Sequence, residues 1–285
     1  MLNTETAKIS ITDLFKSDLQ LTSPPALFFA LKRIIEDPNK SMADAGNLIT
    51  NDPALTMRLL KFVRSPYYGF SGRISTVTQA ISIIGSKELQ NLVLATLIIT
   101  KFSGLPDGMM TMRDFWAMSL RNALTAKELA VALHCHKGDM KESIFICGLL
   151  HEIGKLVFYR QIPEFAREIG LLVEQTGEAE VDVEQKVLGF NHYDAGSELA
   201  RLWNLPAVIP DTIAQHCQPD SSSPYCLIAD IIRSASLISK MELSNHSTDL
   251  SKWGITNDEL SVVMENSKNQ FDEIFSIFYP SPHSP

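Results

Sequence analysis

His151 and Glu152 are the side chains of this sequence whose position most needs a chemical explanation. They lie in residues 143–159, an otherwise mostly apolar run that is predicted to form one buried helix. A buried charge without a partner is strongly destabilising, and Lys155 follows within one turn. Residues three or four apart share a helix face, so both can approach Lys155. The three side chains therefore either satisfy one another and a neighbouring helix, or line a pocket for a metal ion or an anion.

Further imidazole and carboxylate groups follow His151 and Glu152 along the chain. They are His192, His216 and Asp230, and each lies in or at the end of a predicted helix. Such groups on successive helices can converge on a metal ion inside a helical bundle. The spacing alone is not specific, because any helical protein contains scattered histidines. His134 and His136 are expected instead to be residues near a helix C-terminus, where the dipole favours them.

Helical signals run through the whole sequence, and no strand or internal repeat is evident. Apolar periodicity, Pro and Gly breakers and capping residues predict helices at 25–36, 41–50, 53–65, 75–84, 86–102, 112–135, 143–159, 163–176, 191–203, 206–217, 227–241 and 258–279, with an acidic helix after the turn at 177–182. The Gly- and Pro-containing segment 104–108 is the strongest break in the first half. The fold class is therefore all-α, a helical bundle with two lobes that meet near residues 104–110.

Composition limits the classes of function. The 285 residues are 45% hydrophobic and 20% charged, as in globular proteins, and the net charge of −8 argues against a polyanion binder. Arg58, Lys61 and Arg64, with Arg73 beyond them, could form a basic stripe, but a solvated helix face explains them more simply.

Location is predicted from three features of the chain. No apolar run reaches the roughly 18 residues of a membrane span. No signal peptide is evident at the start. The four cysteines form no CxxC pair, and Cys147 is expected to be a reduced core residue. We therefore expect a cytoplasmic protein with no membrane partner.

Several segments resemble known family motifs in the right order. The segment Gly148-Leu-Leu-His-Glu-Ile-Gly-Lys-Leu156 resembles the HD-superfamily signature, in which His-Asp is followed by Ile-Gly-Lys. The surroundings of His192, His216 and Asp230 look like the later motifs of that superfamily. In the first half, segments 52–60, 65–69 and 74–85 resemble a narrower family, the HDOD domain. The resemblance covers roughly residues 20 to 240.

This resemblance implies an HDOD domain over residues 15–245, with a first lobe at about 15–105 and an HD-like lobe at about 110–245. A C-terminal helix and tail would occupy 246–285. The family is related to HD phosphohydrolases and to HD-GYP cyclic-di-GMP phosphodiesterases, but HDOD domains generally lack complete metal chemistry. Three departures agree with that: Glu152 stands where the superfamily has aspartate, Met118 where a relative has its first histidine ligand, and Cys217 where a second histidine would follow His216.

The chemistry of these departures argues against turnover. Two-metal hydrolysis needs enough ligands to hold both ions and an activated water, and a thioether such as Met118 binds hard cations poorly. Glu152 has one more methylene than aspartate, which moves its oxygens by about 1.5 Å, and about 1 Å can already cost orders of magnitude in rate. We therefore assign no catalytic residue and expect no cofactor.

The predicted site residues leave two arrangements open. In one, a vestigial site holds a single divalent metal on His151, Glu152, His192, His216 and Asp230, with Lys155 as the ligand-binding residue. In the other, Glu152 and Asp230 pair with Lys155 or with the histidines, and a closed polar network fixes the helix packing without turnover.

Three functions follow as hypotheses. The leading one is a non-catalytic signal-transduction or regulatory module that binds a signalling protein partner, with a nucleotide or cyclic dinucleotide as a small ligand in the degenerate HD pocket. The alternative is a metal-dependent phosphohydrolase acting on a nucleotide or cyclic dinucleotide, in which Lys155 contacts a phosphate. A nucleic-acid-associated regulator is the weakest, so we expect no nucleic-acid partner. The aromatic segment Tyr67-Tyr-Gly-Phe70 is either a contact surface or a plug between the lobes.

Overall fold

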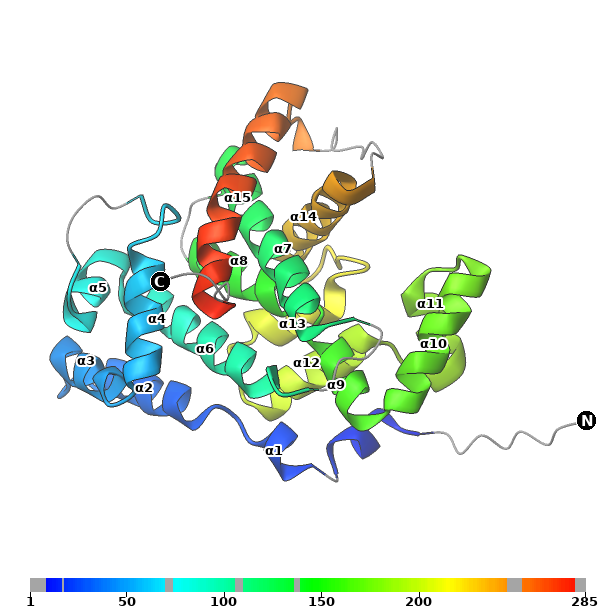
Figure 1. Cartoon of the computed structure of the whole chain (residues 1–285), viewed down its shortest axis with the longest axis horizontal. Helices are drawn as coiled ribbons and strands as arrows, with labels where there is room; N and C mark the ends of the chain where they lie inside the picture. Colours follow the sequence, from blue (N-terminus) through cyan, green and yellow to red (C-terminus); the bar gives the residue numbers. More distant parts are fainter. Residues whose placement is uncertain are drawn as a thin grey trace, which may run out of the picture.

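The protein is all-helical, as predicted. The computed structural model describes residues 9–16, 18–69, 74–105, 110–135, 139–244 and 253–279; the chain is 75% helical, and no strand occurs in these ranges (Figure 1). The elements are η1 Ile11–Phe15, α1 Leu19–Thr22, α2 Ala26–Glu36, α3 Met42–Thr50, α4 Pro53–Val63, α5 Val77–Ile84, α6 Ser86–Phe102, α7 Met112–Ala132, α8 Asp139–Leu150, α9 Ile153–Gln161, α10 Pro163–Thr176, α11 Glu180–Leu188, α12 His192–Leu202, α13 Val208–Gln215, α14 Cys226–Ser244 and α15 Asn257–Phe278. His136, Phe70 and Arg73 lie outside the described residues.

The first lobe consists of the short helices α2 to α5 and the longer α6 (Figure 1). Local signals set where these helices begin. Ser41 and Thr76 form capping boxes at the starts of α3 and α5, and Asp52 caps α4, where Pro53 takes the first helical position. Apolar side chains from all five helices are buried.

The second lobe is built around α7. The helices α8, α14 and α15 pack against it, while α12 packs against both α9 and α13. α15 also contacts α4, so this C-terminal helix touches both lobes. The buried apolar side chains of the two lobes form one continuous core. α10 and α11 stand apart as a hairpin beside α9 (Figure 1).

The run 143–159 is two helices rather than the single helix predicted from its composition. α8 ends at Leu150 and α9 begins at Ile153, which leaves His151 and Glu152 in the turn between them. The His151 ring lies over the end of α8, where its Nδ1 donates to the Gly148 carbonyl oxygen at 2.7 Å. The apolar composition of a segment predicts that it is buried, but it does not predict whether the helix axis changes direction, so this break was not predicted.

Within the described ranges, no single helix has both the length and the apolar composition to cross a membrane. One pair, α5 and α6, meets the requirement together, although the two helices are bent by 118° at their junction.

Candidate functional site

Two glycines bring the backbones of α9 and α12 into contact beside the predicted site. A Cβ atom on Gly154 would lie 1.7 Å from the His192 carbonyl oxygen and 2.7 Å from the Gly196 nitrogen. A Cβ on Gly196 would in turn lie 3.0 Å from the Gly154 nitrogen. Only residues without side chains permit this crossing. Because Lys155 directly follows Gly154, this close approach of the two backbones brings His192 near Lys155.

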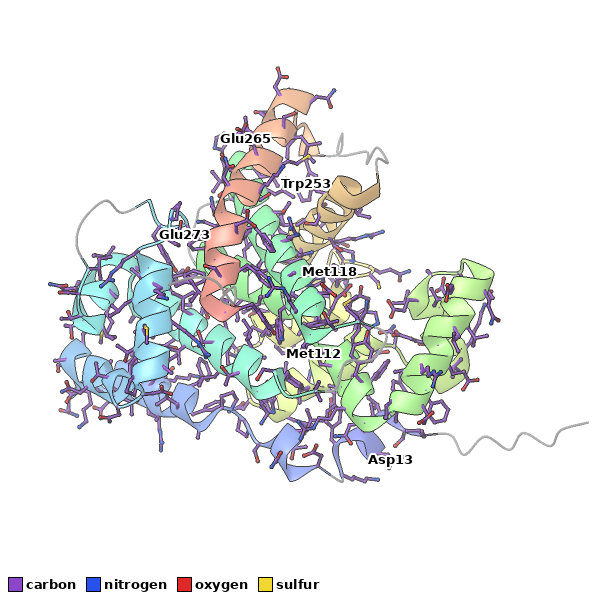
Figure 2. All side chains as sticks on the ribbon, viewed as in Figure 1. Asp13, Met112, Met118, Trp253, Glu265 and Glu273 are labelled. Carbon is purple, nitrogen blue, oxygen red and sulfur yellow. The ribbon has the colours of Figure 1, made fainter. Side chains whose placement is uncertain are left out.

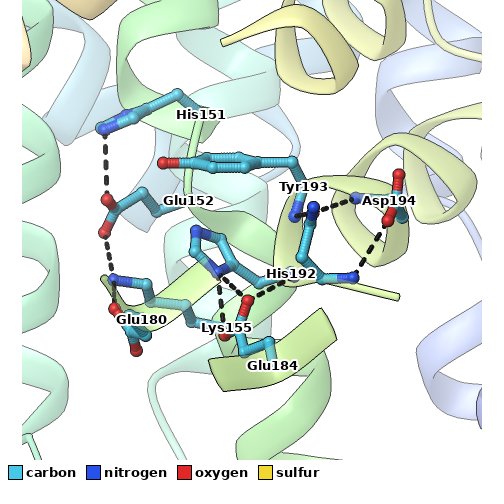
Figure 3. Close-up of polar contacts among 9 residues, drawn as sticks. His151, Glu152, Lys155, Glu180, Glu184, His192, Tyr193 and Asp194 are labelled. Carbon is cyan, nitrogen blue, oxygen red and sulfur yellow. Dashed lines mark hydrogen bonds and ion pairs between the residues drawn. The ribbon is translucent and has the colours of Figure 1, made fainter. Parts of the chain in front are cut away.

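Lys155 is held between two carboxylates in the interior. Its Nζ lies 2.9 Å from Glu152 Oε2 and 2.8 Å from Glu180 Oε2, and the residue is 8% exposed (Figure 3). Burial disfavours the ammonium, but the two carboxylates outweigh burial and hold the pKa of Lys155 well above its usual value. The pairing with Glu152 was expected from their spacing and is present. Glu180, from the first turn of α11, was not foreseen.

α11 also supplies the partner of His192. Glu184, one turn after Glu180, accepts hydrogen bonds from the ring Nδ1 of His192 at 2.7 Å and from its backbone N–H at 2.9 Å (Figure 3). Because the partner is a carboxylate, Nδ1 carries the proton, and in the neutral ring Nε2 keeps its lone pair. Nε2 is buried and has no hydrogen-bond partner among the described residues. A carboxylate behind an imidazole is the arrangement that orients metal-binding histidines.

The remaining rings form a row across the site. The His151 and His216 centroids are 4.8 Å apart, Tyr193 lies 4.9 Å from His216, and His192 lies 4.0 Å from Tyr193. Burial raises the pKa of the Tyr193 hydroxyl and of the Cys217 thiol. The structure thus brings the three predicted histidines together.

The predicted metal donors do not form a ligand set as arranged. In the part of the chain that the structure describes, no three His, Cys, Asp or Glu side chains are grouped so that they could hold a metal ion. Glu152 is directed to Lys155, His151 Nε2 is 3.8 Å from Glu152 Oε1, and Asp230 lies half-buried on α14. The metal site on these residues therefore stays a prediction.

A small cavity lies beside the His151–Glu152 turn. Its volume is about 30 Å³, and it is bounded by α7, the turn and α14 through Met118, Ser119, Arg121, Asn122, His151, Glu152, Ser236 and Ser239. Met118, labelled on α7 in Figure 2, thus lies beside His151, where the resemblance expects a histidine ligand.

Five of the polar residues that line this cavity were not predicted from the sequence. They fall at helical spacing from Met118 or from each other, which is a weak local signal, and they are Ser119, Arg121, Asn122, Ser236 and Ser239. Spacing of this kind indicates a polar face on each helix, but it does not indicate which two helices pack against each other.

Tyr67, from the aromatic segment, packs between the lobes. Tyr67 is buried, and its ring meets Phe62 of α4 and Phe145 of α8 edge-on at 5.3 Å each. The Tyr68 hydroxyl donates to Glu88 at 2.8 Å. Tyr67 therefore acts as a plug, which was one of the two interpretations of this segment.

Two members of the basic stripe on α4 are engaged within the protein. Arg58 donates to the Thr100 hydroxyl at 2.9 Å, and Arg64 donates to the Ile74 carbonyl oxygen at 2.6 Å.

The fold and the His-Glu turn define an HD-type helical protein, and comparisons with known families identify which type. The HDOD domain model matches residues 21–219, so the chain belongs to the HDOD family. An uncharacterised protein of Treponema pallidum is 31% identical over 225 residues, which cover 75% of this chain. The chain spans only 41% of that relative's length.

Solved structures share the fold. A protein from Shewanella amazonensis proposed to be a phosphohydrolase matches with a TM-score of 0.72 and 23% identity, covering 93% of this chain and 97% of its own. An HDOD domain protein of unknown function from Geobacter sulfurreducens gives 0.65 and 22%, with 86% and 83% covered. A protein from Marinobacter aquaeolei proposed to act in signal transduction gives 0.70 and 19%, with 91% and 60% covered. At these identities the likeness concerns the fold alone.

Proposed function

We propose that this chain is a non-catalytic regulatory module of signal transduction, which acts by binding a protein partner and keeps a small ligand pocket beside the His151–Glu152 turn. The observation that carries the proposal is the position of Lys155. In a hydrolase of this type the lysine would be available to a substrate phosphate. Here its ammonium group is buried between Glu152 and Glu180, at 2.9 and 2.8 Å.

The surroundings of Lys155 support the same conclusion. Moving either carboxylate away would leave a buried charge with one partner fewer, which is costly in a low-dielectric interior. Met118 contributes a thioether at the cavity where a metal centre needs a hard or imidazole ligand. The polar groups of the turn therefore stabilise the helix packing and have little capacity left for substrate.

The test is hydrolysis measured with added metal. Wild-type protein and His151→Ala are assayed with bis-p-nitrophenyl phosphate and with cyclic di-GMP in the presence of Mn²⁺, Fe²⁺ or Mg²⁺. We expect both proteins to stay at background, while His151→Ala lowers thermal stability. Metal-dependent turnover in the wild type that disappears in His151→Ala would refute the proposal.

The proposed partner surface is the groove between the lobes. A groove of about 280 Å³ is bounded by Tyr67, Tyr68 and Lys127, and by the apolar side chains Ile83 and Val131, which are 40% and 46% exposed. Exposed apolar side chains that line one groove are typical of interaction sites. A photocrosslinking residue at position 83 should trap the partner in cells, whereas one at Met57, which is exposed but does not line the groove, should not. Equal trapping at both positions would exclude the groove.

A metal-dependent phosphohydrolase acting on a nucleotide or cyclic dinucleotide is the second candidate. One observation favours it: His192 has a carboxylate behind Nδ1 and a buried Nε2 with no hydrogen-bond partner in the described ranges. Elemental analysis of protein purified without added metal or chelator distinguishes the two. Near-stoichiometric Fe, Mn, Zn or Ni that is lost in His192→Ala would support the second candidate, and less than about a tenth of an ion per chain would support the first.

A further inference from the structure

Arg121 is a cation at the cavity beside His151 whose contacts among the described residues include no anion. Its guanidinium lies over the ring of Phe271 on α15, with Cζ 3.7 Å from the ring centroid. Within the described part of the chain it makes no ion pair and no hydrogen bond, although a guanidinium has five N–H donors. The aromatic face holds the group in place and satisfies none of those donors.

Hydroxyl groups line the cavity with Arg121. Ser119 on α7 and Ser236 on α14 are both buried, and neither side chain hydrogen-bonds to a described residue. Ser239 donates to Thr125 at 3.3 Å. Because both residues border the cavity, their hydroxyls are open to whatever occupies it. The hydroxyls of Ser119 on α7 and Ser236 on α14 can therefore both hydrogen-bond to a ligand in the cavity.

The charges around this space favour an anion. An arginine side chain stays protonated in proteins, and the single carboxylate that lines the cavity, Glu152, is paired with Lys155 at 2.9 Å. A guanidinium with nearby hydroxyls is the donor set that suits a tetrahedral oxyanion. The volume of about 30 Å³ is too small for a whole nucleotide, so only a small group can enter the cavity.

We propose that the cavity formed by Arg121, Ser119 and Ser236 binds a phosphate group, either inorganic phosphate or the phosphate of a monoester whose remainder extends outward. The inference rests on the proposed function, since it names the chemical class of the small ligand. Because the donors come from α7 and α14, and Arg121 is stacked on α15, a bound phosphate would tie three helices of the second lobe together.

The experiment is calorimetric titration of the full chain with inorganic phosphate and with AMP at low ionic strength. The variants are Arg121→Gln and, as a matched control, Arg113→Gln. Arg113 also lies on α7 and stacks on a ring of α15, with Cζ 4.9 Å from the Phe275 centroid, but it does not line the cavity. Both variants therefore lose a cation–π contact, and only one loses the proposed donor.

We expect wild type and Arg113→Gln to bind phosphate alike and Arg121→Gln to bind at least about tenfold more weakly. Binding of phosphate alone would identify the free ion as the ligand, and binding of AMP as well would identify a monoester. Ser236→Ala, which should fold normally, should weaken binding too, and it serves if Arg121→Gln does not fold. Binding of neither inorganic phosphate nor AMP by the wild type, or equal affinity in all variants, would overturn the inference. Neither result depends on turnover, which tests the proposed function separately.

Discussion

Replacing Lys155 by methionine tests whether the polar network at the turn is a structural lock. The substitution keeps most of the side-chain volume but removes the ammonium between Glu152 and Glu180. The Glu152 side chain is 9% exposed, so its carboxylate would stay buried without its closest cation. The Glu180 side chain is 39% exposed and can turn to solvent at little cost. The loss in stability should therefore come mainly from Glu152.

The magnitude follows from the burial of that carboxylate. Breaking a buried ion pair by removing one partner typically costs about 3–5 kcal/mol, and we expect Lys155→Met to lower the free energy of unfolding by about that amount at pH 7. In the double variant Lys155→Met/Glu152→Gln the stranded charge is absent, so about half or more of the loss should be recovered.

Urea denaturation followed by circular dichroism provides the measurement. The control is Lys186→Met, which breaks the ion pair with Glu178 on the same helical hairpin, where the side chains are 63% and 42% exposed. Such surface pairs contribute about 0–1 kcal/mol. If Lys155→Met costs no more than Lys186→Met, or if the double variant is as unstable as the single one, the turn is not held by this network and the reasoning fails.

Two other perturbations give expected outcomes. Gly154→Ala should destabilise the fold by about 3 kcal/mol or more, since its Cβ would meet the His192 carbonyl oxygen at 1.7 Å; a thermal melt like that of wild type would contradict the close crossing of α9 and α12. Burial raises the pKa of Asp18, but the ion pair with Arg160, at 2.5 Å, together with the hydrogen bond from the Leu21 backbone N–H, outweighs burial and lowers the pKa below its usual value. The pair therefore stabilises fully above about pH 3.9 and less as pH falls through the folded pKa, so Asp18→Asn should cost about 1 kcal/mol at pH 7 and nothing at the acid end of a stability–pH profile. A deficit independent of pH would show that the carboxylate charge is not involved.

Local sequence signals were sufficient for most of the helices and for one contact of the site. Helix starts predicted near Ser41 and at Asp52-Pro53 are confirmed, with Ser41 and Asp52 as the caps, while the helix predicted from residue 75 begins at Val77. The pairing of Glu152 with Lys155 depends only on residues three apart in the chain. Both are short-range properties, which periodicity and capping rules describe well.

The parts that the sequence did not predict depend on tertiary contacts. Glu180 and Glu184 reach Lys155 and His192 only because α11 folds back beside α9, and spacing within α11 gives no partner for either carboxylate. The turn at His151 was hidden because an apolar run looks alike whether straight or bent. Arg121 looked like an ordinary helix residue, since the ring that holds it comes from α15.

Glu152 connects the closed network to the open cavity. It binds Lys155 on one side and borders the cavity of Arg121 on the other. A carboxylate in that position repels an anion unless a cation neutralises it, and Lys155 is the cation that does so. The Glu152–Lys155 ion pair therefore reduces the repulsion that the Glu152 carboxylate would exert on a phosphate in the neighbouring cavity. Coupling free energies are reciprocal, so a phosphate held by Arg121 would in turn stabilise the Glu152–Lys155 ion pair. Under the proposed function, a site without turnover would respond to a ligand through the stability of the turn.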